Sequence, residues 1–377
     1  MFTFVHTADW QIGKSYSSFP AEKAPLLRQA RLDAIRRVAG VARGAGAGHI
    51  LVAGDVYDAP DVSDRDLLQS LDRMGREQDL IWHLLPGNHD PHQTGGVWER
   101  LLRSGLPRNI RLHLEPRPAM IAEGVAVLPA PLTGRSSPDD PTSWMDGAGT
   151  PGARYRIGLA HGSIQGFGAE EGEAAVPIAP NRAELAGLDY LALGDWHGAT
   201  QVSARVWYSG TPEPDRFPDN EPGYALVVRL PAPGQPPVVE RHATAQYTWW
   251  KRAINITGPE TMLLFEKSIA ATVPAPERLL VKLAIGGTAS LATWSDAEKR
   301  LAALDQRLFH LTVDNTALQV LPETVELEEF GVGDLRRLAE MLSVASREEG
   351  SEKAAIASLA LRKLYLAWQD TRAGDRP

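Results

Sequence analysis

The sequence of 377 residues contains no cysteine. Both a disulfide framework and a thiolate zinc site are therefore excluded. No apolar run approaches the roughly 20 residues that a membrane-spanning helix needs. The amino terminus also lacks the basic segment that opens a signal peptide. From these absences we expect a cytoplasmic protein that makes no contact with a membrane.

The chain has no excess of positive charge, because its 39 lysine and arginine residues are outnumbered by 47 aspartate and glutamate residues. The resulting net charge of −8 argues against a protein that binds nucleic acid through overall basicity. It does not argue against a phosphodiester substrate, since bound divalent cations would reverse the charge locally. Any contact with DNA should therefore be local, metal-assisted or shared with a partner.

The first ninety residues alternate between short apolar runs and amphipathic segments. Residues 2–6, 49–53 and 80–85 read as buried strands, while residues 28–43 and a segment that begins at Asp64 have helical spacing of apolar residues. An order of β-α-β-α-β is typical of a largely parallel sheet covered by helices. The sequence thus predicts the α/β class.

The next part of the chain predicts a second set of strands. Residues 155–159 and 189–193 are apolar runs that end close to histidine and aspartate. Residues 201–208 and 224–230 should complete this second set, and we expect them to pair in an antiparallel manner.

Proline and glycine cluster at residues 231–237 and indicate a domain boundary there. We therefore expect a first domain over residues 1–237, a small α/β domain over 238–330, and C-terminal helices over 331–377. The last helix carries an apolar stripe that ends at Trp368. This stripe is either part of a core, which we favour, or a surface on which a partner docks.

Polar side chains follow five of the predicted strands. Open sheets of this class place their sites at the carboxyl ends of the strands. Carboxylate and amide oxygens and imidazole nitrogens are ligands for divalent cations, so a metal site is predicted. The residues are Asp9 and Gln11, Asp55 and Asp58, Asn88 and His89, His161, and Asp195 and His197. His6 and His83 lie within strands and are interpreted as structural histidines.

The motifs Asp-x-Gln, Gly-Asp-x-x-Asp, Gly-Asn-His-Asp, His-Gly and Gly-Asp-x-His occur in this order. Their set resembles the calcineurin-like metallophosphoesterases. Within that superfamily the chain is most similar to the SbcD-type DNA repair exonucleases, through residues 6–10 (His-Thr-Ala-Asp-Trp), 189–194 and 208–210. The resemblance implies a two-sheet αββα sandwich followed by a small C-terminal α/β appendage and terminal helices.

The same resemblance implies two divalent metal ions and a role for each motif residue. Manganese is the expected metal, and magnesium is the alternative. His89 would act as the catalytic residue beside the scissile phosphate, and Asp58 would orient it. The first metal would be held by Asp9, Gln11, Asp55 and His197, and the second by Asp55, Asn88, His161 and Asp195, with Asp55 bridging the two.

Two positions depart from the family pattern, since Gln11 and Asp195 stand where the family usually has histidine. Both residues can coordinate a hard cation through oxygen. The neutral amide of Gln11 is the weaker donor, so we expect the first metal to be bound more loosely than the second. The departures also leave open the alternative that the chain is a degenerate, non-catalytic relative of this family.

The interpretation that follows is a metal-dependent phosphodiesterase, namely a DNA exo- or endonuclease that acts in DNA repair through two-metal activation of water. The resemblance also implies a homodimer and a coiled-coil ATPase partner of the SbcC type. One alternative is a phosphatase or cyclic-nucleotide phosphodiesterase that acts on small substrates. Another is a non-catalytic subunit of a DNA-repair ATPase complex.

Overall fold

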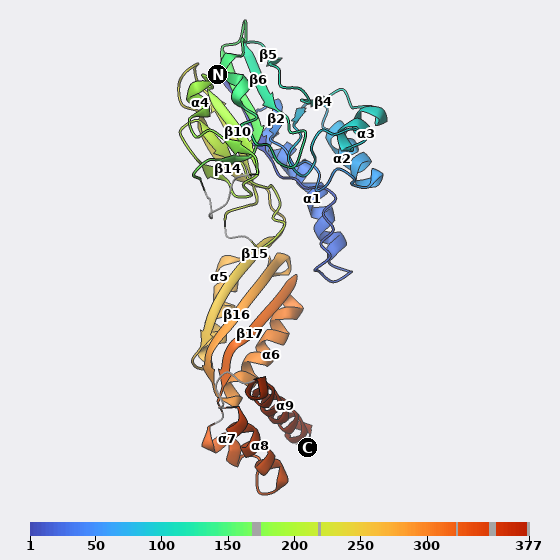
Figure 1. Cartoon of the computed structure of the whole chain (residues 1–377). Helices are drawn as coiled ribbons and strands as arrows, with labels where there is room; N and C mark the ends of the chain where they lie inside the picture. Colours follow the sequence, from blue (N-terminus) through green and yellow to red (C-terminus); the bar gives the residue numbers. More distant parts are fainter. Residues whose placement is uncertain (168–174, 218–219, 322, 347–351, 375–377) are drawn as a thin grey trace. The chain divides into compact units, whose positions relative to one another are not determined.

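The computed structural model describes all residues except 168–174, 218–219, 322, 347–351 and 375–377. The chain forms two compact units, Met1–Tyr247 and Thr248–Pro377 (Figure 1). The sequence-based division has its boundaries after residues 237 and 330. β14 (Val238–Ala243) lies beyond the first of these boundaries and pairs with β13 (Tyr224–Leu230) of the first unit.

The first unit contains a six-stranded sheet in the order β14-β13-β1-β2-β3-β4. β1 to β4 run parallel, and β13 pairs with β1 in an antiparallel manner. The expectation that residues 224–230 belong to the second set of strands is therefore wrong, because β13 returns to the first sheet. The remaining strands of this sheet are β1 (Phe2–Thr7), β2 (His49–Val52), β3 (Ile81–Leu84) and β4 (Ile110–Leu112).

Three helices pack on one face of this sheet: α1 (Ala24–Gly44), α2 (Asp64–Arg76) and α3 (Val97–Ser104). Ser63 caps α2, since its hydroxyl accepts a hydrogen bond from Asp66 N (3.1 Å). The apolar residues of the helices recur every three to four positions and so face the sheet. The core of this layer includes Ile35, Val38, Leu71, Met74, Trp82 and Trp98.

The second sheet has the order β11-β12-β10-β7-β6-β5. β6, β7, β10 and β12 are parallel, so the expectation that residues 201–208 pair in an antiparallel manner is wrong for β12 and correct only for the short pairing of β11 with β12. Apolar alternation predicts a strand but not the direction of its neighbour. The strands are β5 (Ala119–Ala122), β6 (Val125–Ala130), β7 (Tyr155–His161), β10 (Tyr190–Gly194), β11 (Thr200–Gln201) and β12 (Val206–Tyr208).

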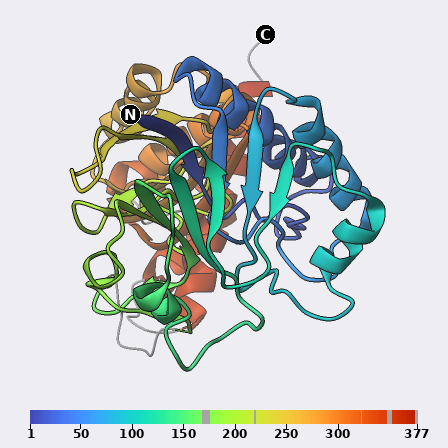
Figure 2. The same cartoon turned by 90° about the horizontal axis from the view of Figure 1, so that it is seen from above.

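The two sheets pack face to face around a core that includes Phe4, Leu51, Ile157, Leu159 and Tyr190. Figure 2 shows the blue and teal strands of the first sheet beside the green strands of the second. The outer face of the second sheet is covered by short segments rather than long helices. They are the 3₁₀ turn η1 (Ser143–Gly147), α4 (Arg182–Leu185) and the strand pair β8 (Ser163–Ile164) and β9 (Pro177–Ile178). The predicted metallophosphoesterase sandwich is thus confirmed.

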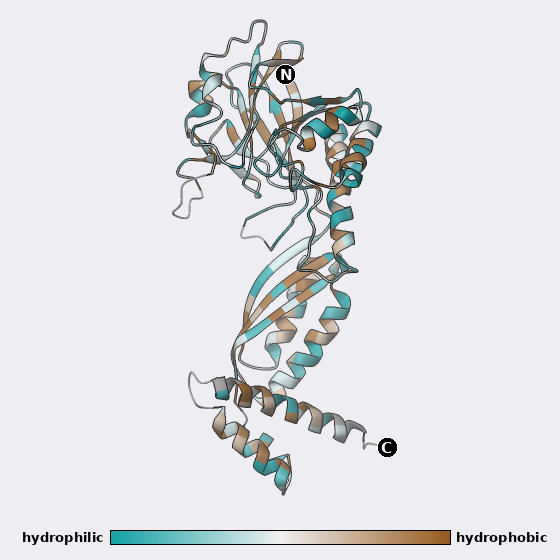
Figure 3. Cartoon of the chain, turned by 45° about the vertical axis from the view of Figure 1, so that its right-hand side comes forward, coloured by the Kyte–Doolittle hydropathy of each residue, from teal (hydrophilic) through white to brown (hydrophobic). Residues whose placement is uncertain are grey.

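The second unit is a three-stranded parallel sheet in the order β15-β16-β17, with helices packed on it. Within β16 burial alternates, since Val281, Leu283 and Ile285 are buried while Lys282 and Ala284 are exposed, as expected when one face is covered and the other is not. Figure 3 shows the hydrophilic and hydrophobic residues of these strands. No described helix of the chain is long and apolar enough to cross a membrane. The elements are β15 (Thr248–Ile256), α5 (Glu260–Thr272), the 3₁₀ turn η2 (Pro276–Arg278), β16 (Leu279–Ala289), α6 (Leu291–Arg307), β17 (His310–Val320), α7 (Thr324–Glu328), α8 (Asp334–Ala345) and α9 (Glu352–Gly374).

The apolar stripe of α9 belongs to the core of the second unit. Leu361 and Tyr365 are buried there, and the Trp368 ring lies against the ring of Phe330 with centroids 5.1 Å apart. The core interpretation of this stripe is therefore correct. Leu364 and Trp368 of this stripe are partly buried against the same core.

Three histidines form a stacked row across the first sheet. His49 Nδ1 lies 3.1 Å from His83 Nε2, and His83 Nδ1 lies 3.0 Å from His113 Nε2. One proton on each ring satisfies both contacts, because each imidazole then donates to the next in the same direction. Burial, the neighbouring rings and Arg111 hold the pKa of His83 well below its usual value, and burial lowers the pKa of His113 to about 4. His83 is thus a hydrogen-bonded structural histidine, as is His6, whose ring contacts Tyr190 Oη at 2.9 Å.

This histidine row predicts a loss of stability in mild acid. The pKa of His113 falls from 6.5 to about 4 on folding. Between these values the unfolded chain binds more protons than the folded chain, so stability is lost as the pH falls from 6.5 towards 4. For His113 alone the loss between pH 7.5 and pH 5 should be about 2 kcal/mol. Urea unfolding at the two pH values measures it.

The His113→Gln variant should show a smaller difference between the two pH values than the wild type. His242→Gln is the matched control, because His242 lies on β14 and is partly exposed. Equal pH dependence in the wild type and in His113→Gln would contradict the role of the row.

Candidate metal centre

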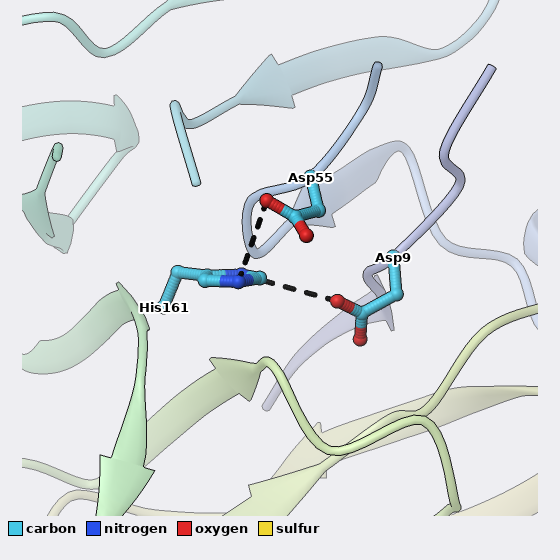
Figure 4. Close-up of side chains that lie close together, drawn as sticks. All are labelled: Asp9, Asp55 and His161. Atoms are coloured by element: carbon cyan, nitrogen blue, oxygen red, sulfur yellow. Dashed lines mark ion pairs between the residues drawn. The ribbon is translucent and has the colours of Figure 1, made fainter. Parts of the chain in front are cut away.

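The carboxyl ends of five strands meet at one rim of the sandwich and bring together Asp9, Asp55 and His161 (Figure 4). One ligand atom from each of the three residues lies within 4.8 Å of the others, and all three side chains are buried. Asp9 follows β1, Asp55 follows β2, and His161 ends β7. The two sheets thus contribute to one cluster.

Three oxygen atoms surround the Nε2 atom of His161. Asn88 Oδ1 lies 3.2 Å away, Asp55 Oδ1 3.5 Å, and Asp195 Oδ1 3.9 Å. The opposite ring nitrogen, Nδ1, lies 2.8 Å from the carbonyl oxygen of Ala53. Because a carbonyl only accepts, Nδ1 carries the proton and the Nε2 lone pair can point at a cation. This donor set of three oxygens and one imidazole nitrogen fits a divalent ion that prefers oxygen ligands.

Gln11 and His197 lie beside each other next to this group. Gln11 Nε2 is 3.4 Å from His197 Nε2, and both side chains are almost fully buried. His197 Nδ1 donates to Asp215 Oδ1 at 3.2 Å. The structure therefore brings together all seven predicted ligand positions along the same rim.

The backbone is strained at these positions. Only five of the described non-glycine residues have a positive φ, and four of them are Asp9, Gln11, Asp55 and Asp195. Such a conformation costs on the order of 1–3 kcal/mol per residue and persists only where the surroundings enforce it. Asp9 N donates to Gly54 O (3.1 Å) and Gln11 N to Asp55 O (2.9 Å), so the loops after β1 and β2 hold each other in place.

Two glycines of the motifs are required by close approach of the backbone. A Cβ atom on Gly194 would lie 2.0 Å from the Ala53 carbonyl oxygen and 2.7 Å from His161 Nδ1. A Cβ atom on Gly87 would lie 2.2 Å from Asp55 Oδ1. Each glycine thus leaves the space that a ligand residue of another loop occupies.

The cluster is acidic, so a positive charge at its centre would stabilise it. Burial opposes the charged form of His161, but the carboxylates of Asp55, Asp9 and Asp195 outweigh it and raise the pKa of His161 to about 9. Burial also raises the pKa of Asp9 to about 6, against the opposing effect of His197 and His161. A divalent cation would supply the charge that these carboxylates require.

His89 lies at the edge of the cluster, and nearly half of its side chain is exposed. Its backbone N–H donates to Asp55 Oδ1 (2.9 Å), and its Nδ1 lies 3.1 Å from the backbone carbonyl of Asp58. The contact that orients His89 therefore comes from the Asp58 backbone. The Asp58 carboxylate lies 3.6 Å from Lys14 Nζ instead.

Four further residues support the cluster, and the sequence alone gave none of them a role. Asp90 accepts from Gly87 N (2.7 Å) and Tyr57 N (3.0 Å) and so fixes the turn that carries Asn88. Buried Arg31 donates to the carbonyls of Trp10, Glu213 and Asp9 and connects two loops. Lys14 and Asp215 form an ion pair at 3.0 Å. Asp90 could have been found as the last residue of Gly-Asn-His-Asp, whereas nothing local marks Arg31.

A two-sheet sandwich with a buried carboxylate–imidazole cluster at its strand ends defines a metal-dependent phosphoester hydrolase. A sequence model described as calcineurin-like phosphoesterase matches residues 2–229, which is more than half of the chain. The chain therefore belongs to the calcineurin-like phosphoesterase family, whose members use divalent metals.

One matching solved structure is the crystal structure of the protein TT1561 of Thermus thermophilus. It is 14% identical to this chain, covers 64% of this chain and 99% of its own, and superposes with a TM-score of 0.41. No curated protein matches the chain at a significant level.

The close approach at Gly194 predicts that Gly194→Ala disrupts the centre. The added methyl would push the Ala53 carbonyl and His161 apart, at a cost of about 1–3 kcal/mol in the free energy of unfolding. Binding of Mn²⁺, followed by calorimetry, should also weaken. Gly40→Ala is the control, because an added Cβ atom on exposed Gly40 in α1 meets nothing within 4 Å. Unchanged stability and metal binding in Gly194→Ala would contradict this account.

Proposed function

We propose that this phosphoester hydrolase is a DNA nuclease of the SbcD type. The observation that carries the proposal is the convergence of Asn88, Asp55 and Asp195 on His161 Nε2, with His89 exposed beside them. A long substrate can stay at the protein surface and still reach the accessible histidine beside the buried ligand group. The choice of DNA rests on the motif resemblance at residues 6–10, 189–194 and 208–210.

Under this proposal the centre holds two divalent cations, with Mn²⁺ expected. Such ions neutralise phosphate charge and acidify water. The first would be held by Asp9, Gln11, Asp55 and His197, and the second by Asp55, Asn88, His161 and Asp195.

Under this proposal His89 donates a proton to the departing oxygen. Its Nδ1 proton is held by the Asp58 carbonyl (3.1 Å), so the ring presents Nε2 towards the cluster, 4.0 Å from Asp55 Oδ2. The protonated ring would donate from Nε2 either to the leaving alkoxide or to a phosphoryl oxygen of the transition state. Asp58 then acts as a positioning residue through its backbone.

The proposed partners are a second copy of the chain and an SbcC-type coiled-coil ATPase. α8 offers a surface for the ATPase, since Leu335, Leu338, Met341 and Val344 recur every three residues and are exposed. Apolar rows of this kind on a helix often serve as contacts for another protein.

The substrate proposal predicts Mn²⁺-dependent degradation of DNA by the full chain. Labelled single- and double-stranded DNA, nucleoside monophosphates, a 3′,5′-cyclic nucleotide and a bis-aryl phosphodiester are compared at equal enzyme concentration. Turnover of the DNA and the bis-aryl diester is the expected result. Turnover of only the small nucleotides would favour the phosphatase or cyclic-nucleotide alternative, and no turnover of any substrate would favour a non-catalytic subunit.

The His89→Ala variant tests whether this activity arises at the candidate metal centre. It should lose roughly 10²–10⁴-fold in turnover, the range of a positioned acid–base group, while Mn²⁺ binding stays close to that of the wild type. His92→Ala is the control, because His92 lies on the same loop and outside the cluster. Loss of metal binding in His89→Ala would show that His89 is a ligand.

The partner proposal predicts that Met341→Glu combined with Val344→Glu abolishes co-purification with the coiled-coil ATPase. Two charges on the exposed row of α8 would be desolvated on binding, which opposes the contact. Leu264→Glu is the control, since Leu264 is an exposed leucine on α5 of the same unit. Retention of the ATPase by the double variant, or no ATPase with the wild type, would contradict the proposal.

A further inference from the structure

Four side chains close a ring at the first-metal position. Lys14 Nζ lies 3.3 Å from Gln11 Oε1, and Gln11 Nε2 lies 3.4 Å from His197 Nε2. His197 Nδ1 lies 3.2 Å from Asp215 Oδ1, and Asp215 Oδ2 lies 3.0 Å from Lys14 Nζ. Gln11, His197 and Asp215 are buried, and Lys14 is partly buried. We name these residues the Lys14 ring.

Donors and acceptors match at the three hydrogen-bond contacts of the Lys14 ring, and the fourth contact, between Lys14 and Asp215, is an ion pair in which Asp215 Oδ2 makes no hydrogen bond. The Asp215 carboxylate forms an ion pair with Lys14 (Oδ2 to Nζ, 3.0 Å) and therefore acts only as an acceptor towards His197. His197 must then carry its proton on Nδ1, which leaves a lone pair on Nε2. The Gln11 NH₂ group donates to that lone pair, and the Gln11 oxygen accepts from the Lys14 ammonium.

The same contacts occupy both atoms with which Gln11 and His197 would hold a cation. Gln11 can coordinate only through Oε1, and in the Lys14 ring this oxygen faces Lys14. If the amide turned its oxygen towards His197, its NH₂ group would meet the ammonium of Lys14, a contact between two donors. The Lys14 side chain therefore opposes the orientation of Gln11 that a metal requires.

We propose that Lys14 is a positioning residue that holds the Gln11 amide away from the first metal and makes this position the weak one of the centre. The inference rests on the proposed assignment of Gln11 and His197 to the first metal. The second position is built differently, since Asn88 and Asp55 face His161, and Asp55 also accepts from the backbone of His89. The chain should therefore bind one cation tightly and the other only at higher concentration.

Calorimetric titration of the full chain with Mn²⁺ tests the proposal. The wild type should show one tight and one weak binding event. Lys14→Met should tighten the weak event at least ~10-fold and leave the tight event unchanged, whereas Lys14→Arg, which keeps a cationic donor, should keep the weak event weak. Lys267→Met is the matched control for the loss of one positive charge, because Lys267 is exposed on α5 in the second unit. Two equally tight events in the wild type, or no change in Lys14→Met, would overturn the proposal.

A double-mutant cycle separates the amide orientation from simple charge repulsion. In a Gln11→Leu background the amide is absent, so Lys14→Met should no longer tighten the weak event. An equal gain in both backgrounds would mean that Lys14 acts only through its charge, which would overturn the positioning role.

The tautomer of His197 gives a readout that needs no metal. Long-range ¹H–¹⁵N spectra of the metal-free protein, assigned with a His197→Gln variant, should show the proton of His197 on Nδ1. A proton on Nε2 would overturn the hydrogen-bond pattern of the Lys14 ring. Neither the spectra nor the titration depends on DNA turnover, so the failure of the proposed substrate and the failure of this inference are distinguishable.

Discussion

The centre of this protein is organised by the repulsion among carboxylates held close together and out of water. Asp9, Asp55 and Asp195 all act on His161, and at an effective dielectric constant near 20 two like charges 4 Å apart repel by about 4 kcal/mol. These carboxylates favour the charged form of His161 and raise its pKa to about 9, while burial is the main cause that raises the pKa of Asp9 to about 6. The group therefore requires a positive charge among its carboxylates. A divalent cation meets the same requirement more fully than a proton, and the family to which the chain belongs uses such cations.

The scaffold holds the three mutually repelling carboxylates together through features that would not stabilise other parts of the fold. Positive φ angles at Asp9, Gln11, Asp55 and Asp195 aim the side chains at one point. Gly87 and Gly194 leave the space for neighbouring loops. Arg31, buried among carbonyl oxygens, ties the loop after β1 to the loop after β12. Strain of this kind is tolerated because the two sheets and their cores are rigid, and it places the ligands before any cation arrives.

The two halves of the centre differ in chemistry. Around His161 the donors are mainly anionic oxygens. Around His197 the neighbouring side chain is the neutral amide of Gln11, and Lys14 lies next to it. An oxygen-rich position suits Mn²⁺ or Mg²⁺, while the position beside His197 carries a positive charge of its own. This asymmetry bears on metal occupancy without deciding the substrate.

The sequence by itself determined the α/β class, the order of the first strands and helices, and the motif residues that meet in the centre. It could do so because strand periodicity and the glycine–aspartate pairs are local signals. It did not determine the parallel pairing of β12, the return of β13 to the first sheet, or the contact of His89 with the Asp58 backbone rather than its carboxylate. Nor did it indicate the histidine row or the Lys14 ring. Those features depend on side chains such as His49, His83 and His113, or Lys14 and Asp215, which are far apart in the chain and become neighbours only when the sheets form. No local pattern records such pairing, so only the tertiary structure decided it.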